Sequence, residues 1–94
     1  MQIQEIVSLV TEKTGVSSAI LFTKTKKDEI VNARHMVAYI ARKYGHSVSG
    51  IARSFAENGY ECIHTNIVYA VKRGSHKYKT IPYFKSIVKS ITND

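Results

Sequence analysis

The chain has 94 residues and a formal net charge of +7, from 14 Lys or Arg against 7 Asp or Glu. This length predicts one compact domain over residues 1–94, the composition is that of a globular protein rather than a disordered one, and the excess positive charge favours a polyanionic partner. The single cysteine, Cys62, excludes an intramolecular disulfide and favours the cytoplasm, and no apolar run approaches the ~20 residues that cross a membrane.

Helix is expected almost throughout, because there is one proline and no stretch alternates between apolar and polar residues at period two. Residues 2–14 have the spacing of an amphipathic helix, which Gly15 ends. A short helical turn follows, with residues 19–22 supplying core. The run TKTKK at residues 23–27 then places three lysines directly before a longer helix.

The long helix is predicted over residues 28–44, with two acids in its first turn, where the helix dipole favours them. Its buried stripe is predicted to be Ile30, Ala33, Val37, Ile40 and Tyr44, with Arg34, Arg42 and Lys43 pointing elsewhere.

A helix-turn-helix is predicted over residues 47–73. Ser47 is suited to cap the first helix, and Asn58-Gly59 to end it. The second helix begins near Cys62. Its apolar face comprises Ile63, Ile67, Ala70 and Val71, and its outer face carries His64, Thr65, Val68, Tyr69, Lys72 and Arg73.

Beyond Arg73, Gly74 is predicted to break the helix and to open a basic connector. Thr80 is expected to cap a last helix that has Pro82 in its first turn. Tyr83, Phe84, Ile87, Val88 and Ile91 would close the core. The prediction is an all-α fold, a compact bundle of about six helices around a central long helix, containing the helix-turn-helix.

The segment IVNARHMVAYIARKYGHSVSGIARSF, followed by HTNIVYAV, resembles the C-terminal DNA-binding domain of the bacterial chromosomal replication initiator DnaA. The resemblance covers roughly residues 1–75 in order and spacing, and it includes the Ala-Arg pair Ala33-Arg34 and the His-Thr element at His64-Thr65. It implies a fold related to Trp-repressor-like helix-turn-helix domains, a role in replication initiation, and double-stranded DNA as the partner.

The resemblance also implies a division of roles among the site residues. The helix that starts near Cys62 would read the major groove through His64 and Thr65, and the Lys24–Lys27 loop would reach the minor groove or phosphates, with Lys26 in the groove. Arginines of the long helix and serines of the turn would contact phosphates. The predicted DNA-binding residues are Lys24, Lys26, Lys27, Arg34, Arg42, Ser47, Ser49, His64, Thr65, Asn66, Tyr69 and Lys72.

The chain departs from the family pattern between the two helices. The family's Gly-Gly-Arg-Asp is replaced by the longer AENGYECI, which puts Ile63 at the position of the Asp that helps to read bases in the family. The sequence therefore leaves open whether this chain shares the family's target sequence. There is no Walker A motif, and no ATPase is predicted. Cys62 and His64 are two apart on a helix and cannot pair as nucleophile and base, and the histidines lack zinc-ligand spacing. We therefore expect no enzyme activity, no cofactor and no metal.

The altered turn leaves a second function class open. A protein-interaction or regulatory module could have kept the fold and lost sequence-specific DNA binding, with a partner at the Asn58–Cys62 turn around Tyr60. RNA binding is less favoured, since no aromatic stacking platform stands out. Duplex DNA as partner and the lack of a membrane segment together predict a cytoplasmic, nucleoid-associated location.

Overall fold

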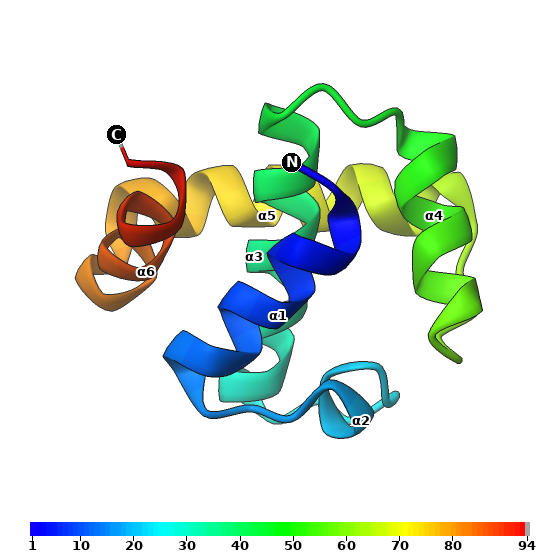
Figure 1. Cartoon of the computed structure of the whole chain (residues 1–94), viewed down its shortest axis with the longest axis horizontal. Coiled ribbons are helices and arrows are strands. Elements are labelled where there is room, and N and C mark those ends of the chain that lie inside the picture. The colour runs from blue at the N-terminus through cyan, green and yellow to red at the C-terminus, as the bar shows by residue number, and fades with distance from the viewer. Residues whose placement is uncertain (94) are drawn as a thin grey trace.

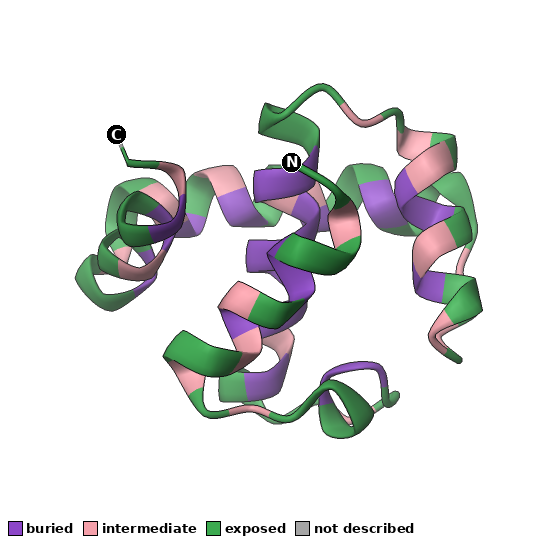
Figure 2. Cartoon of the chain, in the orientation of Figure 1, coloured by how far each residue is buried: buried purple, intermediate pink, exposed green. Residues whose placement is uncertain are grey.

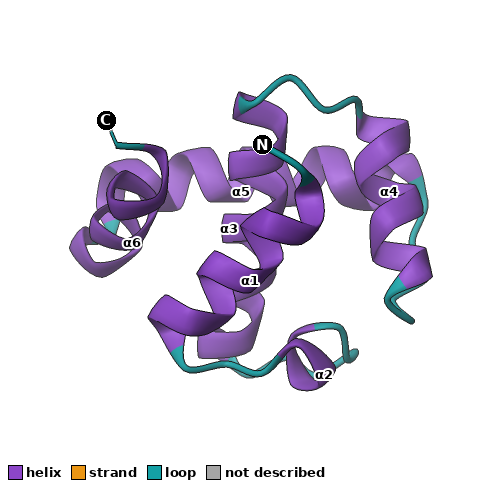
Figure 3. Ribbon diagram, in the orientation of Figure 1, coloured by secondary structure: helices purple, strands orange, loops and turns teal. Residues whose placement is uncertain are grey.

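The computed structural model describes residues 1–93, and these fold into helices joined by short loops (Figure 1, Figure 3). No strand occurs within this range, which confirms the prediction of an all-α bundle of about six helices. The helices are α1 (Ile3–Thr14), α2 (Ser18–Leu21), α3 (Asp28–Lys43), α4 (Val48–Glu57), α5 (His64–Thr80) and α6 (Pro82–Thr92).

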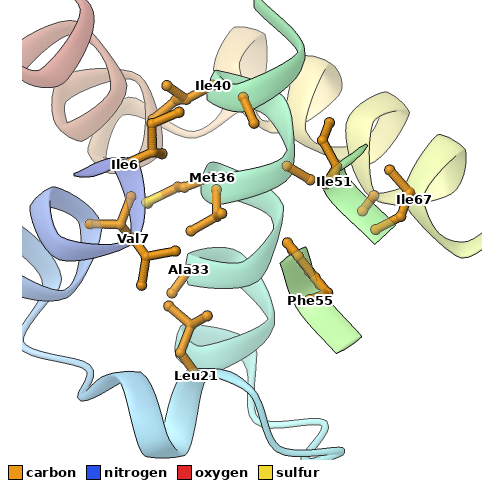
Figure 4. Packing of buried hydrophobic residues seen from close by; sticks show 14 of the residues in the cluster. Ile6, Val7, Leu21, Ala33, Met36, Ile40, Ile51, Phe55 and Ile67 are labelled. Atoms are coloured by element: carbon orange, nitrogen blue, oxygen red, sulfur yellow. The ribbon is translucent and has the colours of Figure 1, made fainter. Parts of the chain in front are cut away.

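Helix α3 is the central support of the fold, as predicted, because it packs against each of the other helices. Figure 1 shows α1 in front of it, α5 crossing behind, α4 and α6 at opposite sides and α2 at its foot. The core lies along these contacts: in Figure 4, Ile6 of α1 approaches α3 on the side where Met36 and Ile40 point, and Phe55 of α4 approaches α3 from the other side. In Figure 2 the buried segments accordingly line the inner faces of the helices.

The predicted signals at the start and end of α4 are confirmed. The Ser47 hydroxyl accepts a hydrogen bond from the Gly50 amide at 3.0 Å, which satisfies an amide that has no partner within the helix. Asn58 is the C-cap, and Gly59 follows with a φ of 92°, in the left-handed region that a glycine adopts without steric cost. Both ends of the first helix of the helix-turn-helix are therefore set locally.

The predicted break at Gly74 is wrong, because α5 continues to Thr80 and contains Gly74 as a buried residue. A Cβ at this position would lie 2.7 Å from the Tyr39 Cβ and 3.0 Å from the His35 carbonyl oxygen. The glycine thus lets α5 cross close to α3 rather than ending the helix. Thr80 closes α5 instead of capping α6, whose N-cap is Ile81, with Pro82 in the first turn as predicted.

Several apolar residues predicted to be buried are exposed instead. Tyr44 is 39% exposed and Ile63 is 66% exposed, because they form the C-cap of α3 and the N-cap of α5 and so fall outside the helical register. Ile20 and Tyr83 are about half exposed, at 49% and 57%. The core predicted for the C-terminal helix is otherwise present, with Phe84, Val88 and Ile91 buried.

Candidate nucleic-acid interface

Helices α4 and α5 form the predicted helix-turn-helix, joined by residues 58–63 (Figure 1). The second helix begins at His64, close to the predicted start at Cys62. Asn66 organises this start, since its Oδ1 accepts a hydrogen bond from the Ile63 amide at 3.0 Å. One polar atom of this predicted contact residue is therefore engaged in the helix start.

Two predicted site residues meet at the first turns of α4 and α5. The Ser49 Oγ lies 3.2 Å from the His64 Nε2, within hydrogen-bond distance. Beside this pair is an open hollow of about 700 Å³ whose walls include the small residues Ala52 and Ala56. His64, Thr65 and Ser49 all line it and are all exposed, so their polar atoms face the surface of the helix-turn-helix.

Tyr69 and Lys72 lie further along the outer face of α5. Tyr69 is 61% exposed, and its ring also contacts His35 edge-on, with centroids 6.4 Å apart. The side chain therefore packs against His35 while most of it faces solvent, and its contact with phosphate stays a prediction. Lys72 is exposed one position before Arg73.

The basic loop lies beside the start of α5. The Lys24 Nζ donates a hydrogen bond to the Glu61 carbonyl oxygen at 2.6 Å and stands 3.9 Å from the centre of the Tyr60 ring. Lys26 and Lys27 are exposed in the same loop. The tertiary structure therefore brings together two segments that are 37 residues apart in sequence and that were predicted to contact neighbouring parts of one duplex.

Arg34 is placed differently from the sequence prediction, which had it pointing away from the buried face. It is 7% exposed, and its guanidinium donates to the carbonyl oxygens of Leu21, Thr23 and Thr25 at 3.2, 2.7 and 2.8 Å. The planar fork of an arginine can hold several acceptors at once. Arg34 thus holds the backbone that leads into the basic loop.

Arg42 and Ser47 lie together at the end of α3 and the start of α4. The exposed Arg42 donates from Nη1 to the His46 carbonyl oxygen at 3.3 Å, and Ser47 caps α4 with its hydroxyl. Both side chains are exposed, so the Arg42 guanidinium and the start of α4 are both accessible from solvent. All predicted contact residues other than Arg34 are exposed in the structure.

Tyr60 is the residue in this region whose role sequence reasoning missed. Its ring packs edge-on against Phe55, with centroids 5.9 Å apart, and the Lys24 ammonium and Arg34 guanidinium lie 3.9 and 5.0 Å from its centre. The ring is half-buried among these groups instead of projecting as a knob. An aromatic residue in a turn gave the only sequence signal, and this signal did not specify the partners.

A buried polar cluster between α3 and α5 was also missed. The Lys77 Nζ lies 2.9 Å from the His35 Nδ1 and 2.7 Å from the Asn32 Oδ1. Burial, and then the charge of Lys77, lower the pKa of His35 to about 4, and burial lowers the pKa of Lys77. Since an ammonium only donates, the neutral imidazole accepts at Nδ1 and carries its proton at Nε2. The spacing of Asn32 and His35 on one helix face was visible in the sequence, but the distant Lys77 was not.

Across residues 1–93 no group of three His, Cys, Asp or Glu side chains could hold a metal ion. In the same range, no helix combines the length and apolar character needed to cross a bilayer. Burial raises the pKa of the Cys62 thiol, which favours the unreactive protonated form.

Comparison with known proteins gives one family. The model of the bacterial dnaA protein helix-turn-helix matches residues 3–73, a segment that begins with α1 and ends within α5. It contains the basic loop, the whole of α4, the turn after it and the first part of α5. No curated protein and no solved structure matches the chain.

Proposed function

The chain belongs to the bacterial DnaA helix-turn-helix family, whose domain binds duplex DNA and does not catalyse a reaction. We propose that the chain binds the duplex with three of its segments. The first turn of α5 enters the major groove. The loop over residues 24–27 lies on the adjacent minor groove or backbone, and the α3–α4 corner contacts phosphates. Action on a duplex also supports the expected nucleoid-associated location.

One observation carries this arrangement. The hydrogen bond from Lys24 Nζ to the Glu61 carbonyl oxygen, at 2.6 Å, puts the basic loop directly beside the start of α5. A single duplex can then meet the loop and the helix in neighbouring grooves, as a recognition helix and a basic arm do in other helix-turn-helix proteins.

His64 and Thr65 are the proposed base readers. They are exposed in the first turn of α5, where side chains are short enough for the helix to approach base edges. The Thr65 hydroxyl can hydrogen-bond to a base, and its methyl group can meet a thymine methyl. Asn66 is tied to the Ile63 amide by its oxygen, so it contributes through its amide nitrogen.

Phosphate contacts supply affinity in this proposal. The exposed cations Lys26, Lys27, Arg42 and Lys72, together with the Ser47 and Ser49 hydroxyls and Tyr69, surround the reading helix. Lys24 keeps two of its three ammonium hydrogens after donating to Glu61. Release of counterions from about five phosphates gives a log–log salt slope of roughly −4 to −5. Arg34 acts through the loop backbone that it holds.

A fluorescence-anisotropy titration tests the proposal with the whole chain. An initiator-box duplex and a randomised duplex are each titrated at two salt concentrations. Salt-sensitive binding, tighter on the box, is expected. Thr65→Ala should flatten the preference, while Arg42→Ala should weaken both duplexes alike and lower the salt slope by about 1. Lys89→Ala, an exposed cation in α6, is the matched control and should bind like the wild type.

The protein-interaction alternative is decided by the same titration. Absence of binding to either duplex at low salt would contradict the DNA proposal and favour the alternative. Its surface would then centre on Ile63, which is 66% exposed at the rim of the hollow, because Tyr60 is packed against Phe55.

A further inference from the structure

The basic loop and the turn between α4 and α5 are joined by one aromatic ring. The Tyr60 ring has two cations close to it: the Lys24 ammonium, 3.9 Å from its centre, and the Arg34 guanidinium, 5.0 Å from its centre. Both cations also bind backbone carbonyls, Lys24 that of Glu61 in the turn and Arg34 those of the segment from Leu21 to Thr25. We call these three side chains, Lys24, Tyr60 and Arg34, the bracket.

We propose that Tyr60 is a positioning residue for DNA recognition, which fixes the basic loop relative to α5 through the bracket. The inference rests on the proposed function for its DNA readout, and it assigns a role to the enlarged turn. Through its contacts with Lys24 and Arg34, the ring fixes the positions of Lys26 and Lys27 relative to the first turn of α5, which reads the bases.

The chemistry of the bracket suits this role. The aromatic ring attracts both cations, and it packs in a T-shaped pair with Phe55, which itself forms a T-shaped pair with Phe22 at the end of α2. The loop is thereby tied to the core at Phe22 and Phe55 and to the turn at Tyr60. A flexible basic loop would lose conformational freedom on binding DNA, whereas a loop already held in place loses less.

The bracket also separates the lysines of the loop into two groups. The Lys24 ammonium is committed to the Glu61 carbonyl and to the Tyr60 ring. Lys26 and Lys27 have exposed side chains and lie in the segment whose entry Arg34 holds. Their contacts with DNA should therefore depend on Tyr60, although neither residue touches its ring.

A double-mutant cycle with Tyr60→Leu and Lys26→Ser tests this dependence on box DNA. In the wild type, Lys26→Ser should weaken binding about tenfold and lower the salt slope by about 1. With Tyr60→Leu already present, it should weaken binding less than about threefold. Tyr60→Phe keeps the ring and should restore the full effect. Tyr83→Leu, at an exposed tyrosine of α6, is the control for loss of a tyrosine elsewhere. Equal effects of Lys26→Ser in all backgrounds would overturn the inference.

Amide hydrogen exchange of the protein without DNA tests the bracket independently of binding. Residues 23–27 should exchange faster in Tyr60→Leu than in the wild type, and at the wild-type rate in Tyr60→Phe. Should Tyr60→Leu fail to fold, by circular dichroism, Lys24→Met removes one cation of the bracket and should give the same acceleration. Unchanged exchange in a folded variant would refute the bracket even where DNA binding is intact. If the wild type does not bind DNA but Tyr60→Leu still accelerates exchange over residues 23–27, the proposed function is refuted and the bracket is not.

Discussion

Arg34 and Lys77 are both buried cations, and the structure gives each of them neutral hydrogen-bond acceptors. Arg34 binds three backbone carbonyls, and Lys77 lies against an amide oxygen and an imidazole nitrogen. A buried charge is tolerated when its hydrogens are accepted in this way. Each side chain thereby fixes a piece of backbone or a helix pair rather than meeting solvent.

Burial of His35, and then the charge of Lys77 beside it, lower the pKa of His35 and make the stability of the domain depend on pH. The pKa of this buried imidazole is about 4, against 6.5 in the unfolded chain, so the unfolded state binds the extra proton between these values. Stability is full above about pH 6.5 and falls as the pH drops toward 4. The difference amounts to at most about 3 kcal/mol. Urea unfolding of the wild type and of His35→Gln at several pH values measures it.

His35→Gln is the matched variant, because the glutamine oxygen can still accept from Lys77 but does not titrate. It should remove the His35 part of the slope between pH 6.5 and 4 and leave the part due to acidic residues. Parallel pH curves for the two proteins would contradict the assignment.

At the scale of one element, α5 carries two roles that meet at Gly74. Its first turns present the proposed reading residues, and its last turns pack on α3 and α6. Gly74 allows the close crossing with α3, where Tyr39 leaves no room for a side chain. The position of the reading helix therefore depends on a glycine ten residues beyond its start at His64.

Gly74→Ala should destabilise the domain although alanine is the better helix former. The new Cβ would lie 2.7 Å from the Tyr39 Cβ and 3.0 Å from a backbone oxygen, so the helices must separate. We expect a net loss of about 1–3 kcal/mol, because overpacking outweighs the roughly 1 kcal/mol gain in helix propensity. Thermal and urea unfolding measure the change.

Gly50→Ala in α4 is the control for that prediction. There the new Cβ meets only the Ser47 hydroxyl oxygen, at 3.2 Å, and this oxygen needs to shift by only a few tenths of an ångström, a movement that keeps its hydrogen bond from the Gly50 amide. This variant should unfold within about 0.5 kcal/mol of the wild type. A Gly74→Ala protein at least as stable as Gly50→Ala would show that the crossing is not tightly packed.

At the scale of the whole molecule, the core extends beyond the segment that matches the family. The match ends at residue 73, yet α6 buries Phe84, Val88 and Ile91 against α1, α3 and α5. Figure 1 shows α6 on the opposite side of the molecule from α4. The helix that completes the core is therefore remote from the proposed DNA-binding surface.

A chain that ends after Arg73 should consequently fail to fold cooperatively. Three fully buried side chains at about 2 kcal/mol each are comparable with the total stability of a domain this size, about 5–15 kcal/mol. Circular dichroism should show reduced helix content and no sharp thermal transition. A chain ending at Asn93 is the control and should melt like the full protein. A cooperative transition in the short chain would show that α6 is dispensable.

The sequence by itself determined the helices of the helix-turn-helix and the family. Helical spacing, the Ser47 cap and the Asn58-Gly59 stop are local signals, and the structure has each of them in place. The exposure of His64, Thr65 and Lys26 also followed from local pattern, since polar residues opposite an apolar face remain in solvent. Their contacts with DNA remain a proposal.

Only the tertiary structure decided the parts that depend on a distant partner. From the sequence, Gly74 is predicted to break the helix, but the structure places it against Tyr39 in a close helix crossing. Arg34 is predicted to be a surface charge, but the structure buries it against three backbone carbonyls. Tyr60 is predicted to project from the turn as a protein-binding residue, but in the structure Lys24 lies over its ring. The physical reason is common to all three residues: local periodicity records which face a residue occupies, whereas burial of a charge or a close helix crossing depends on the groups that the fold brings opposite.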